Sequence, residues 1–503
     1  RKVTFLRNSN LEDIERSAFS STSLKSIEIP QKVKKIGQYA FKDCNKLKTV
    51  SFEEGSRLEL IEKDAFMNSK LKSLQIPHNT NLNEGLCNEV PKLKEIIISE
   101  NHPKYLFFNN EILLEKNDYN SDTYDVLIYA RSDLKKVTIP NFVKRIGPNA
   151  FKNIKSCLEV VEFEPDSKLE IIDEDVFNTC LIKSIKIPSS VKKIANTNFS
   201  ECKFIEKFEF DEGSKLTKIS SSLFSYSSIK SIILPPSVTV IKTKAFLACL
   251  KLKEIRVTKD SKLQSIQTKA FDGSSIETID IPANFDVFEE GWSFNTPNLT
   301  NINLSKDNKK YKELNGMILL NSTNSEKEGD ERYDTIVFAK RDIKDVVVPK
   351  YVKMIGSYAF EKCSSIDQVS FEPDSELKEI DNHAFSKSSI KTIIFPQHLK
   401  KIGYSSFYMC SKLQNIEFGN NSELKTIGKF SFCKTSLEKI YIPSCVSFIG
   451  ECSFKSCNKI KNVEFSNESK LQTIEANAFS NSSLESIKIP DSVIEIKNNS
   501  FSG

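Results

Sequence analysis

The same dipeptide returns along this chain at an almost constant interval. An apolar residue followed by proline, usually Ile-Pro, marks ten repeat positions, at Pro30, Pro77, Pro140, Pro188, Pro235, Pro282, Pro349, Pro396, Pro443 and Pro490. The successive intervals are 47, 63, 48, 47, 47, 67, 47, 47 and 47 residues. Self-similarity at a fixed period of this length is the signature of stacked, near-identical structural units. The chain is therefore predicted to form a repeat architecture rather than a compact globular fold.

The 47-residue unit consists of two similar half-units. A phenylalanine that usually follows Ala or Ser recurs at steps that mostly alternate between 22 and 25 residues. Its positions are Phe19, Phe41, Phe66, Phe151, Phe177, Phe199, Phe224, Phe246, Phe271, Phe294, Phe360, Phe385, Phe407, Phe432, Phe454, Phe479 and Phe501. Each half-unit thus has the length of a leucine-rich repeat.

Each half-unit is expected to contain one strand, one turn and one compact return. Leu24, Ile27 and Ile29 follow the L-x-x-L-x-L pattern, with polar residues alternating outward. Pro30 has no N–H group and ends the strand, and Gly37 suits a turn with positive φ. The Ala-Phe pair that follows begins the return, where we expect a short helical or 3-10 turn.

Nineteen segments match this strand pattern, and they predict the fold class. One half-unit cannot bury its own apolar face, whereas a stack of half-units forms one continuous core. We therefore expect an α/β leucine-rich-repeat solenoid with one long parallel sheet and short helical or 3-10 turns on the opposite side. Residues 1–503 are interpreted as a single solenoid domain.

Two segments interrupt the repeat where the proline interval stretches, near residues 101–131 and 305–341. They resemble each other, since YLFFNNEILL and YDVLIYAR in the first correspond to YKELNGMILL and YDTIVFAK in the second. Each is interpreted as two strands joined by a polar loop, a hairpin-like insert. Such an insert either patches one irregular repeat or provides a hinge or an added binding edge.

Composition argues against several classes of function. The 72 Lys and Arg residues nearly balance the 67 Asp and Glu residues, and no basic tract carries interleaved aromatic residues, so no nucleic-acid partner is expected. No apolar run approaches the length of a membrane span. Because the last residues end just after a repeat phenylalanine, we expect the chain to be a fragment of a longer protein.

The twelve cysteines follow the repeat rather than a metal or catalytic pattern. Seven lie three residues after a repeat phenylalanine: Cys44, Cys180, Cys202, Cys249, Cys363, Cys410 and Cys457. Most recur two stacked turns apart, roughly 9–10 Å, which exceeds the reach of a disulfide. They are interpreted as buried thiols, although pairing of Cys180 with Cys202, or among Cys433, Cys445 and Cys452, stays open.

No catalytic, metal or cofactor site is predicted. The four histidines, His78, His102, His383 and His398, are scattered without metal-ligand spacing, and C-x-x-C and phosphate-binding glycine motifs are absent from the sequence. Acidic residues recur at turn positions, where turn chemistry explains them.

The repeat unit resembles the BspA-type leucine-rich repeat. The resemblance rests on Val-x-x-Ile-Gly-x-x-Ala-Phe-x-x-Cys-x-x-Leu-x-x-Val-x-Phe, as in residues 33–52, and on its near copy at 352–371. It implies a cell-surface protein of a mucosal bacterium or a protozoan parasite, of a class implicated in adhesion to host matrix, host cells or other microbes. The two inserts and the irregular unit at Gly85-Leu86-Cys87 depart from the pattern. The motif marks structure, so it assigns no binding residue.

A candidate ligand-binding surface follows from the strands themselves. The strand position between the last two apolar residues is expected to face outward, and it is mostly polar along the chain. Val347, Ile394 and Tyr441 break that rule on alternate strands, about 10 Å apart. Exposed apolar residues in a row indicate an interface, unless side chains of the neighbouring strands cover them.

The leading hypothesis is a non-catalytic adhesin or receptor-like ectodomain, at the cell surface or secreted. It would bind a protein or glycan ligand, including host extracellular matrix or cell surface, through the repeat sheet. The alternative is an intracellular, cytoplasmic scaffold or inhibitor-like protein-binding module. Free thiols and unmodified Asn-x-Ser/Thr sequons would favour that alternative. The sequence identifies neither the ligand nor the oligomeric state.

Overall fold

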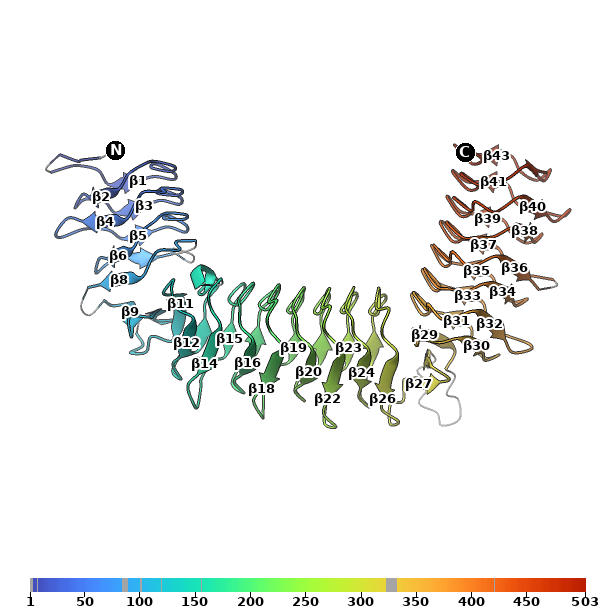
Figure 1. Cartoon of the computed structure of the whole chain (residues 1–503), viewed down its shortest axis with the longest axis horizontal. Helices are drawn as coiled ribbons and strands as arrows, with labels where there is room; N and C mark the ends of the chain where they lie inside the picture. Colours follow the sequence, from blue (N-terminus) through green and yellow to red (C-terminus); the bar gives the residue numbers. More distant parts are fainter. Residues whose placement is uncertain are drawn as a thin grey trace. The chain divides into compact units, whose positions relative to one another are not determined.

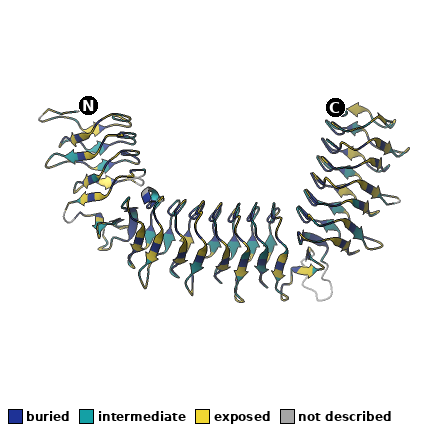
Figure 2. Cartoon of the chain, in the orientation of Figure 1, coloured by how far each residue is buried: buried dark blue, intermediate teal, exposed yellow. Residues whose placement is uncertain are grey.

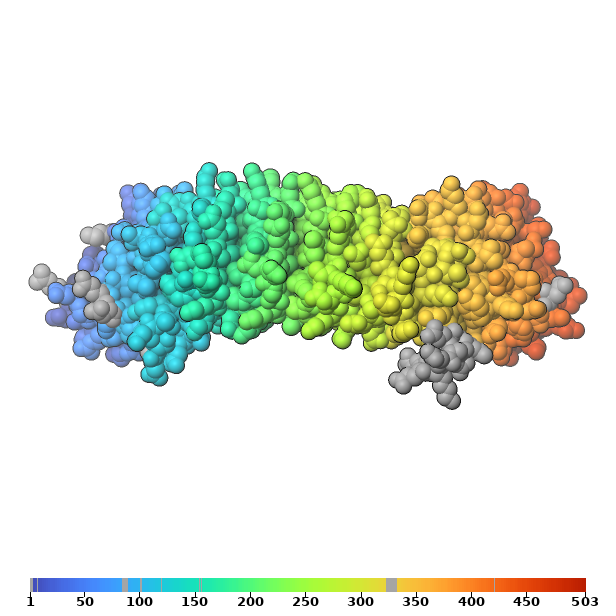
Figure 3. Space-filling view, turned by 90° about the horizontal axis from the view of Figure 1, so that it is seen from below, coloured from blue at the N-terminus to red at the C-terminus, as the bar shows by residue number. Residues whose placement is uncertain are grey.

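The computed structural model describes residues 3–6, 8–83, 89–99, 102–118, 120–154, 156–322, 333–419 and 421–503. The chain divides into two compact units, residues 1–251 (unit 1) and 252–503 (unit 2), and each is described by itself. Figure 1 labels their strands, and within each unit the turns follow one another in chain order (Figure 3). A single domain over residues 1–503 stays a prediction. The irregular repeat at Gly85-Leu86-Cys87 lies outside the described residues.

Every predicted strand segment carries a strand, which confirms the solenoid of parallel strands. In unit 1 these long strands are β2 (Ser26–Ile29), β4 (Thr49–Phe52), β6 (Ser73–Ile76), β8 (Glu95–Ile98), β12 (Lys136–Ile139), β14 (Val160–Phe163), β16 (Ser184–Ile187), β18 (Lys207–Phe210) and β20 (Ser231–Leu234). In unit 2 they are β22 (Glu254–Val257), β24 (Thr278–Ile281), β26 (Asn301–Leu304), β30 (Asp345–Val348), β32 (Gln368–Phe371), β34 (Thr392–Phe395), β36 (Asn415–Phe418), β38 (Lys439–Ile442), β40 (Asn462–Phe465) and β42 (Ser486–Ile487). Neighbours pair in parallel, as Ser26 with Thr49 and Ile29 with Phe52.

A second wall consists of two-residue strands, and about every other one follows a repeat proline. The carbonyl oxygen of each of the ten prolines accepts a hydrogen bond from the N–H three residues later, at 3.1–3.2 Å, and this turn leads into the short strand. Unit 1 contains β1 (Asp13–Ile14), β3 (Lys35–Ile36), β5 (Leu60–Ile61), β7 (Asn81–Leu82), β13 (Arg145–Ile146), β15 (Ile171–Ile172), β17 (Lys193–Ile194), β19 (Lys218–Ile219) and β21 (Val240–Ile241). Unit 2 contains β23 (Ser265–Ile266), β25 (Val287–Phe288), β31 (Met354–Ile355), β33 (Glu379–Ile380), β35 (Lys401–Ile402), β37 (Thr426–Ile427), β39 (Phe448–Ile449), β41 (Thr473–Ile474) and β43 (Glu495–Ile496).

The expected helical or 3-10 turns on the opposite side are wrong as a recurring element. The described residues contain no α-helix, and their one 3-10 turn is the three-residue η1 (Lys152–Ile154). The return segments instead form a third hydrogen-bonded wall, since the N–H groups of His383, Phe385 and Lys387 donate to carbonyl oxygens of the next turn at 2.7–2.8 Å. His383 and Lys387 have φ of 55° and 58°, and a left-handed residue on each side of the phenylalanine prevents a helix from continuing.

Each insert forms a three-stranded antiparallel element rather than a two-stranded hairpin. The first contains β9 (Tyr105–Phe108), β10 (Ile112–Glu115) and β11 (Val126–Ala130), and the second contains β27 (Tyr311–Leu314), β28 (Met317–Leu320) and β29 (Thr335–Ala339). The run YLFFNNEILL thus holds two strands, which the sequence reading merged into one. Because β11 pairs in parallel with β13, and β29 with β31, each insert continues the wall of short strands.

A buried arginine anchors the second insert. Arg341 follows β29, is 1 % exposed, and donates from its guanidinium to the Ala359 carbonyl oxygen at 2.9 Å and to Ser293 Oγ at 3.1 Å. Its guanidinium carbon lies 4.6 Å from the centre of the Phe338 ring. These contacts attach the insert to repeats on both of its sides within unit 2.

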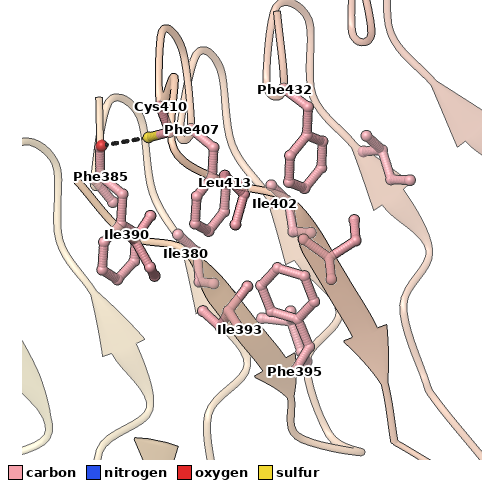
Figure 4. Close-up of a cluster of buried hydrophobic side chains, with 14 of the residues drawn as sticks. Ile380, Phe385, Ile390, Ile393, Phe395, Ile402, Phe407, Cys410, Leu413 and Phe432 are labelled. Atoms are coloured by element: carbon pink, nitrogen blue, oxygen red, sulfur yellow. Dashed lines mark hydrogen bonds between the residues drawn. The ribbon is translucent and has the colours of Figure 1, made fainter. Parts of the chain in front are cut away.

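The repeat phenylalanines form the core of each unit as stacked rings. The ring centre of Phe385 lies 4.8 Å from that of Phe360, with an interplanar angle of 7°. It lies 5.0 Å from that of Phe407, with an angle of 5° (Figure 4). The strands contribute their inward residues to the same core, so buried and exposed positions alternate along them (Figure 2). Offset parallel rings at this spacing combine large apolar burial with favourable ring contacts.

The recurring cysteines complete the core. The thiol of Cys410 donates to the Phe385 carbonyl oxygen of the preceding turn at 2.9 Å (Figure 4). Cys249 makes the same contact with the Phe224 carbonyl oxygen. All eleven cysteines that the structure describes carry thiols rather than disulfides, so the pairings that the spacing left open are not formed. Burial raises the pKa of Cys249 and Cys410 to about 12.

Replacing Phe385 by alanine is expected to lower the free energy of unfolding by about 3–5 kcal/mol, because it opens a cavity between two stacked rings. Phe448→Ala is the control, since that ring is 42 % exposed and its loss should cost less than about 1 kcal/mol. Urea unfolding followed by circular dichroism measures both, and equal losses would contradict a core built on the ring stack.

The buried thiols should make the fold sensitive to alkali. The pKa of Cys249 and Cys410 in the folded protein lies above the ordinary thiol value of 9.0, so the unfolded chain loses these protons first as pH rises. Stability from these groups is complete below pH 9 and falls as pH rises from 9 toward 12, by roughly 1.4 kcal/mol per unit and thiol. Thermal melting between pH 7 and 11 tests this, with Cys249→Ala and Cys410→Ala expected to flatten the slope. A slope unchanged by these substitutions would contradict the assignment.

Candidate functional site

The outward positions of unit 2's long strands form a row. Along each strand the buried residue before this position holds the strand on the core, so the next side chain points away from it. The parallel register sets Val347 beside Ser370, Ile394 beside Glu417, and Tyr441 beside Glu464. β36 and β38 lie next to each other, so the row continues across the two groups of strands.

The three apolar candidates in this row face solvent. Val347 is 55 % exposed, Ile394 59 % and Tyr441 51 %. Side chains of the neighbouring strands therefore do not cover them, which was the alternative to a binding role. The structure brings the three together on alternate strands of one wall, about 10 Å from one to the next. Their role in binding stays a prediction.

Two carboxylates interleave with the apolar residues. Glu417 and Glu464 are exposed, and within the described part of the chain neither forms an ion pair. In unit 1, by contrast, acidic groups of the same wall are paired, as Lys136 with Glu162 at 2.7 Å and Lys186 with Asp211 at 2.6 Å. Reading the row only for apolar residues missed the two glutamates. Their regular alternation with Ile394 and Tyr441 was the available signal.

Other outward apolar residues are isolated. Ile233, in β20 of unit 1, is 59 % exposed, and Ile97, in β8, stands beside polar Gln75. Neither belongs to a run on alternate strands. Single exposed apolar residues are ordinary on protein surfaces, so these two indicate no site.

Two of the four histidines, His102 and His383, pack within the fold. His102 is buried, and its Nδ1 accepts hydrogen bonds from the backbone N–H groups of Lys104 and Tyr105 at 3.1 and 3.2 Å. Burial lowers the pKa of His102. His383 stacks on Tyr358 with ring centres 4.9 Å apart. No group of three His, Cys, Asp or Glu side chains in the described ranges is arranged to hold a metal ion. In the same ranges, no helix has the length and apolar character to span a membrane.

Asn198 illustrates how the repeat uses a residue that could be mistaken for a modification site. It begins an Asn-x-Ser/Thr sequon, yet its side chain is fully buried and donates to the carbonyl oxygens of Asp173 and Ala195 at 2.7 and 3.1 Å. A glycan at this position is incompatible with the fold.

Comparison with known proteins agrees with the repeat architecture. The model of the BspA type leucine rich repeat region matches residues 12–126, 125–253, 217–315, 333–424 and 378–503. A leucine-rich repeat protein from Eubacterium ventriosum is similar, with a TM-score of 0.53, 19 % identity, and coverage of 79 % of this chain and 94 % of that one. The pneumococcal vaccine antigen PcpA gives 0.52, 20 %, 78 % and 87 %.

Among curated proteins, none matches the chain. At these identities the structural likeness shows the fold alone, whereas the family model covers most of the sequence. The chain therefore belongs to the BspA type leucine-rich repeat family.

Proposed function

We propose that this chain is a non-catalytic binding protein of the cell surface, an adhesin or receptor-like ectodomain. One observation carries the proposal: Val347, Ile394 and Tyr441 are exposed on one wall, at equal spacing, among residues that are otherwise polar. Leucine-rich repeat proteins of this family are generally protein-binding, and an apolar row rimmed by polar groups suits that role. The partner would be a host protein or glycan of the extracellular matrix or cell surface.

The row of Val347, Ile394 and Tyr441 suits a partner that packs against the outward face of the long strands. Tyr and large aliphatic side chains supply contact area at low cost in conformational entropy. Ser370, small and polar, separates Val347 from Ile394 and leaves room for a partner's side chain between them. The interleaved carboxylates favour basic groups opposite them.

The same surface would also serve an intracellular scaffold or inhibitor-like module. The thiols of the described cysteines are the observation that favours this second candidate, because oxidising compartments favour disulfides. Thiol counting and glycan mass on protein from its natural source separate the two locations. Disulfides or attached glycans would place the chain outside the cell, whereas twelve thiols and no glycan would favour the scaffold.

The double variant Ile394→Ser and Tyr441→Ser is expected to weaken binding to the responding ligand at least about tenfold, because it removes two apolar anchors. The measurement is surface plasmon resonance against a panel of purified extracellular matrix proteins, with adhesion to cultured epithelial cells alongside. Ile233→Ser is the matched control, since that side chain is equally exposed and isolated. Unchanged binding by a folded double variant would remove this row as the site.

Replacing Glu417 and Glu464 by glutamine tests the charge of the partner. Loss of two unpaired carboxylates from the row should slow association severalfold and reduce its dependence on salt, since exposed charges act mainly on the encounter rate. Association rates at 50 and 300 mM NaCl measure this. Glu162→Gln provides a control whose carboxylate lies on the same wall in unit 1. Faster association by the double variant would indicate an acidic partner instead.

A further inference from the structure

A hollow on the wall of short strands in unit 1 gathers basic side chains. Its volume is about 440 Å³, and its lining includes Arg145, Asp173, Lys193, Lys218 and Lys242. A second hollow of about 350 Å³ shares Arg145, Asp173 and Lys193 with the first, so the two form one continuous groove. The groove lies on a different wall and in a different unit from the row of Val347, Ile394 and Tyr441.

The charge of the groove is not balanced by its own acids. Three of the four carboxylates that line it are bound to cations: Asp173 to Arg145 at 2.5 Å, Glu170 to Lys192 at 2.9 Å, and Asp125 to Lys144 at 3.1 Å. Glu174 is the fourth. Within the described residues, Lys193, Lys218 and Lys242 form no ion pair, so the groove keeps a positive excess.

Three successive turns contribute these lysines, with Lys242 displaced by two residues from Val240, the register partner of Lys218. Lys193 begins β17, Lys218 begins β19, and Lys242 directly follows β21, so they stand on three successive turns. Turns follow one another at about 4.8 Å, which gives an array of charges along the groove rather than one closed pocket. Lysine ammonium groups on flexible stems act as point charges and suit a ligand with repeated anionic groups.

The surroundings of the array narrow the class of that ligand. Among the residues that the structure describes, no aromatic side chain lines either hollow, so the bases of a nucleic acid would find no ring there to stack on. β15 is paired on both sides, with β13 and β17. β17 and β19 end two separate sheets, but they belong to successive turns that the Ser220 hydroxyl joins by donating to the Ile194 carbonyl oxygen, so the backbone of an acidic peptide has no room to pair between them. A polar sugar chain needs neither feature.

We propose that this groove binds an anionic polysaccharide through Lys193, Lys218 and Lys242, by contacts to sulfate or carboxylate groups that recur along the sugar chain. Such a ligand would hold the protein on an anionic glycan while the row in unit 2 stays available to another partner. The proposal does not depend on the function proposed for that row.

The test uses the full chain with Lys193, Lys218 and Lys242 all changed to glutamine. The matched control changes Lys46, Lys70 and Lys203 to glutamine, which removes the same charge from exposed lysines elsewhere in unit 1. Binding to immobilised dextran sulfate is measured at 50 and 150 mM NaCl, with neutral dextran of equal length as the reference. We expect the groove variant to bind about tenfold more weakly than the control variant, the combined effect of losing three ion contacts in the groove.

Several outcomes would overturn the proposal. If both variants lose the same affinity for dextran sulfate, net charge alone explains the binding. If neutral dextran binds as tightly as dextran sulfate, the protein does not recognise charge. Inorganic sulfate that competes as well as dextran sulfate, at an equal concentration of sulfate groups, would exclude recognition of a polysaccharide chain. Polyglutamate that binds as tightly, with the same dependence on the three lysines, would replace the sugar by an acidic peptide. Thermal melting of both variants confirms that each is folded.

Discussion

The hydrogen bonds between successive turns are the constraint on which the rest of each unit depends. Hydrogen bonds between backbone N–H and carbonyl groups join successive turns along three walls: the long strands, the short strands and the return segments that contain the repeat phenylalanine. The backbone fixes the distance between turns. When the same residue type recurs at one repeat position, its side chains in successive turns therefore lie that distance apart. The rings of Phe360, Phe385 and Phe407 stack for this reason.

The same constraint produces the surface features. A position that faces outward in one turn faces outward in the next, so its residues form a row, and a local bias in composition becomes an extended site. Tyr441 alone would be an ordinary exposed tyrosine, but with Ile394 and Val347 it forms an apolar row. Lys193 alone would be a solvated lysine, but with Lys218 and Lys242 it makes a groove of unbalanced charge.

Much of the fold was predictable because it depends on local patterns that recur. The prolines mark a turn in all ten units, the strand segments carry strands, and the spacing of Cys363 and Cys410 indicated buried thiols rather than bridges. The site was predictable in part for the same reason, since alternation within a strand shows which residues point outward. Whether neighbours cover Ile394 depends on the length of the side chains on both sides, which the structure was needed to show.

The wrong predictions concern backbone and side-chain geometry that cannot be inferred from the residue types. Ala and Phe in the return segment suggested a helical turn, yet Tyr39 and Asp43 on either side of Phe41 have φ of 59° and 57°. Left-handed backbone at a tyrosine carries no composition signal, because the inter-turn hydrogen bonds impose it against the residue's own preference. Arg341 likewise carries the charge of a surface residue, and its contact with Ser293 joins positions far apart in sequence.

These differences between the walls indicate where a binding function can develop. The backbone after the short strands is packed closely: a Cβ added to Gly428 would lie 2.5 Å from backbone atoms of Gly403 in the preceding turn. The return segments are constrained differently, because they contain residues with left-handed backbone and the buried phenylalanine ring. Two kinds of position can change without affecting the fold: the outward positions of the long strands and the first residue of the short strands. Val347, Ile394 and Tyr441 occupy the first class of position, and Lys193 and Lys218 the second. Both proposed surfaces therefore use positions that the repeat leaves open to change, and substitutions there should alter binding while the core keeps its stability.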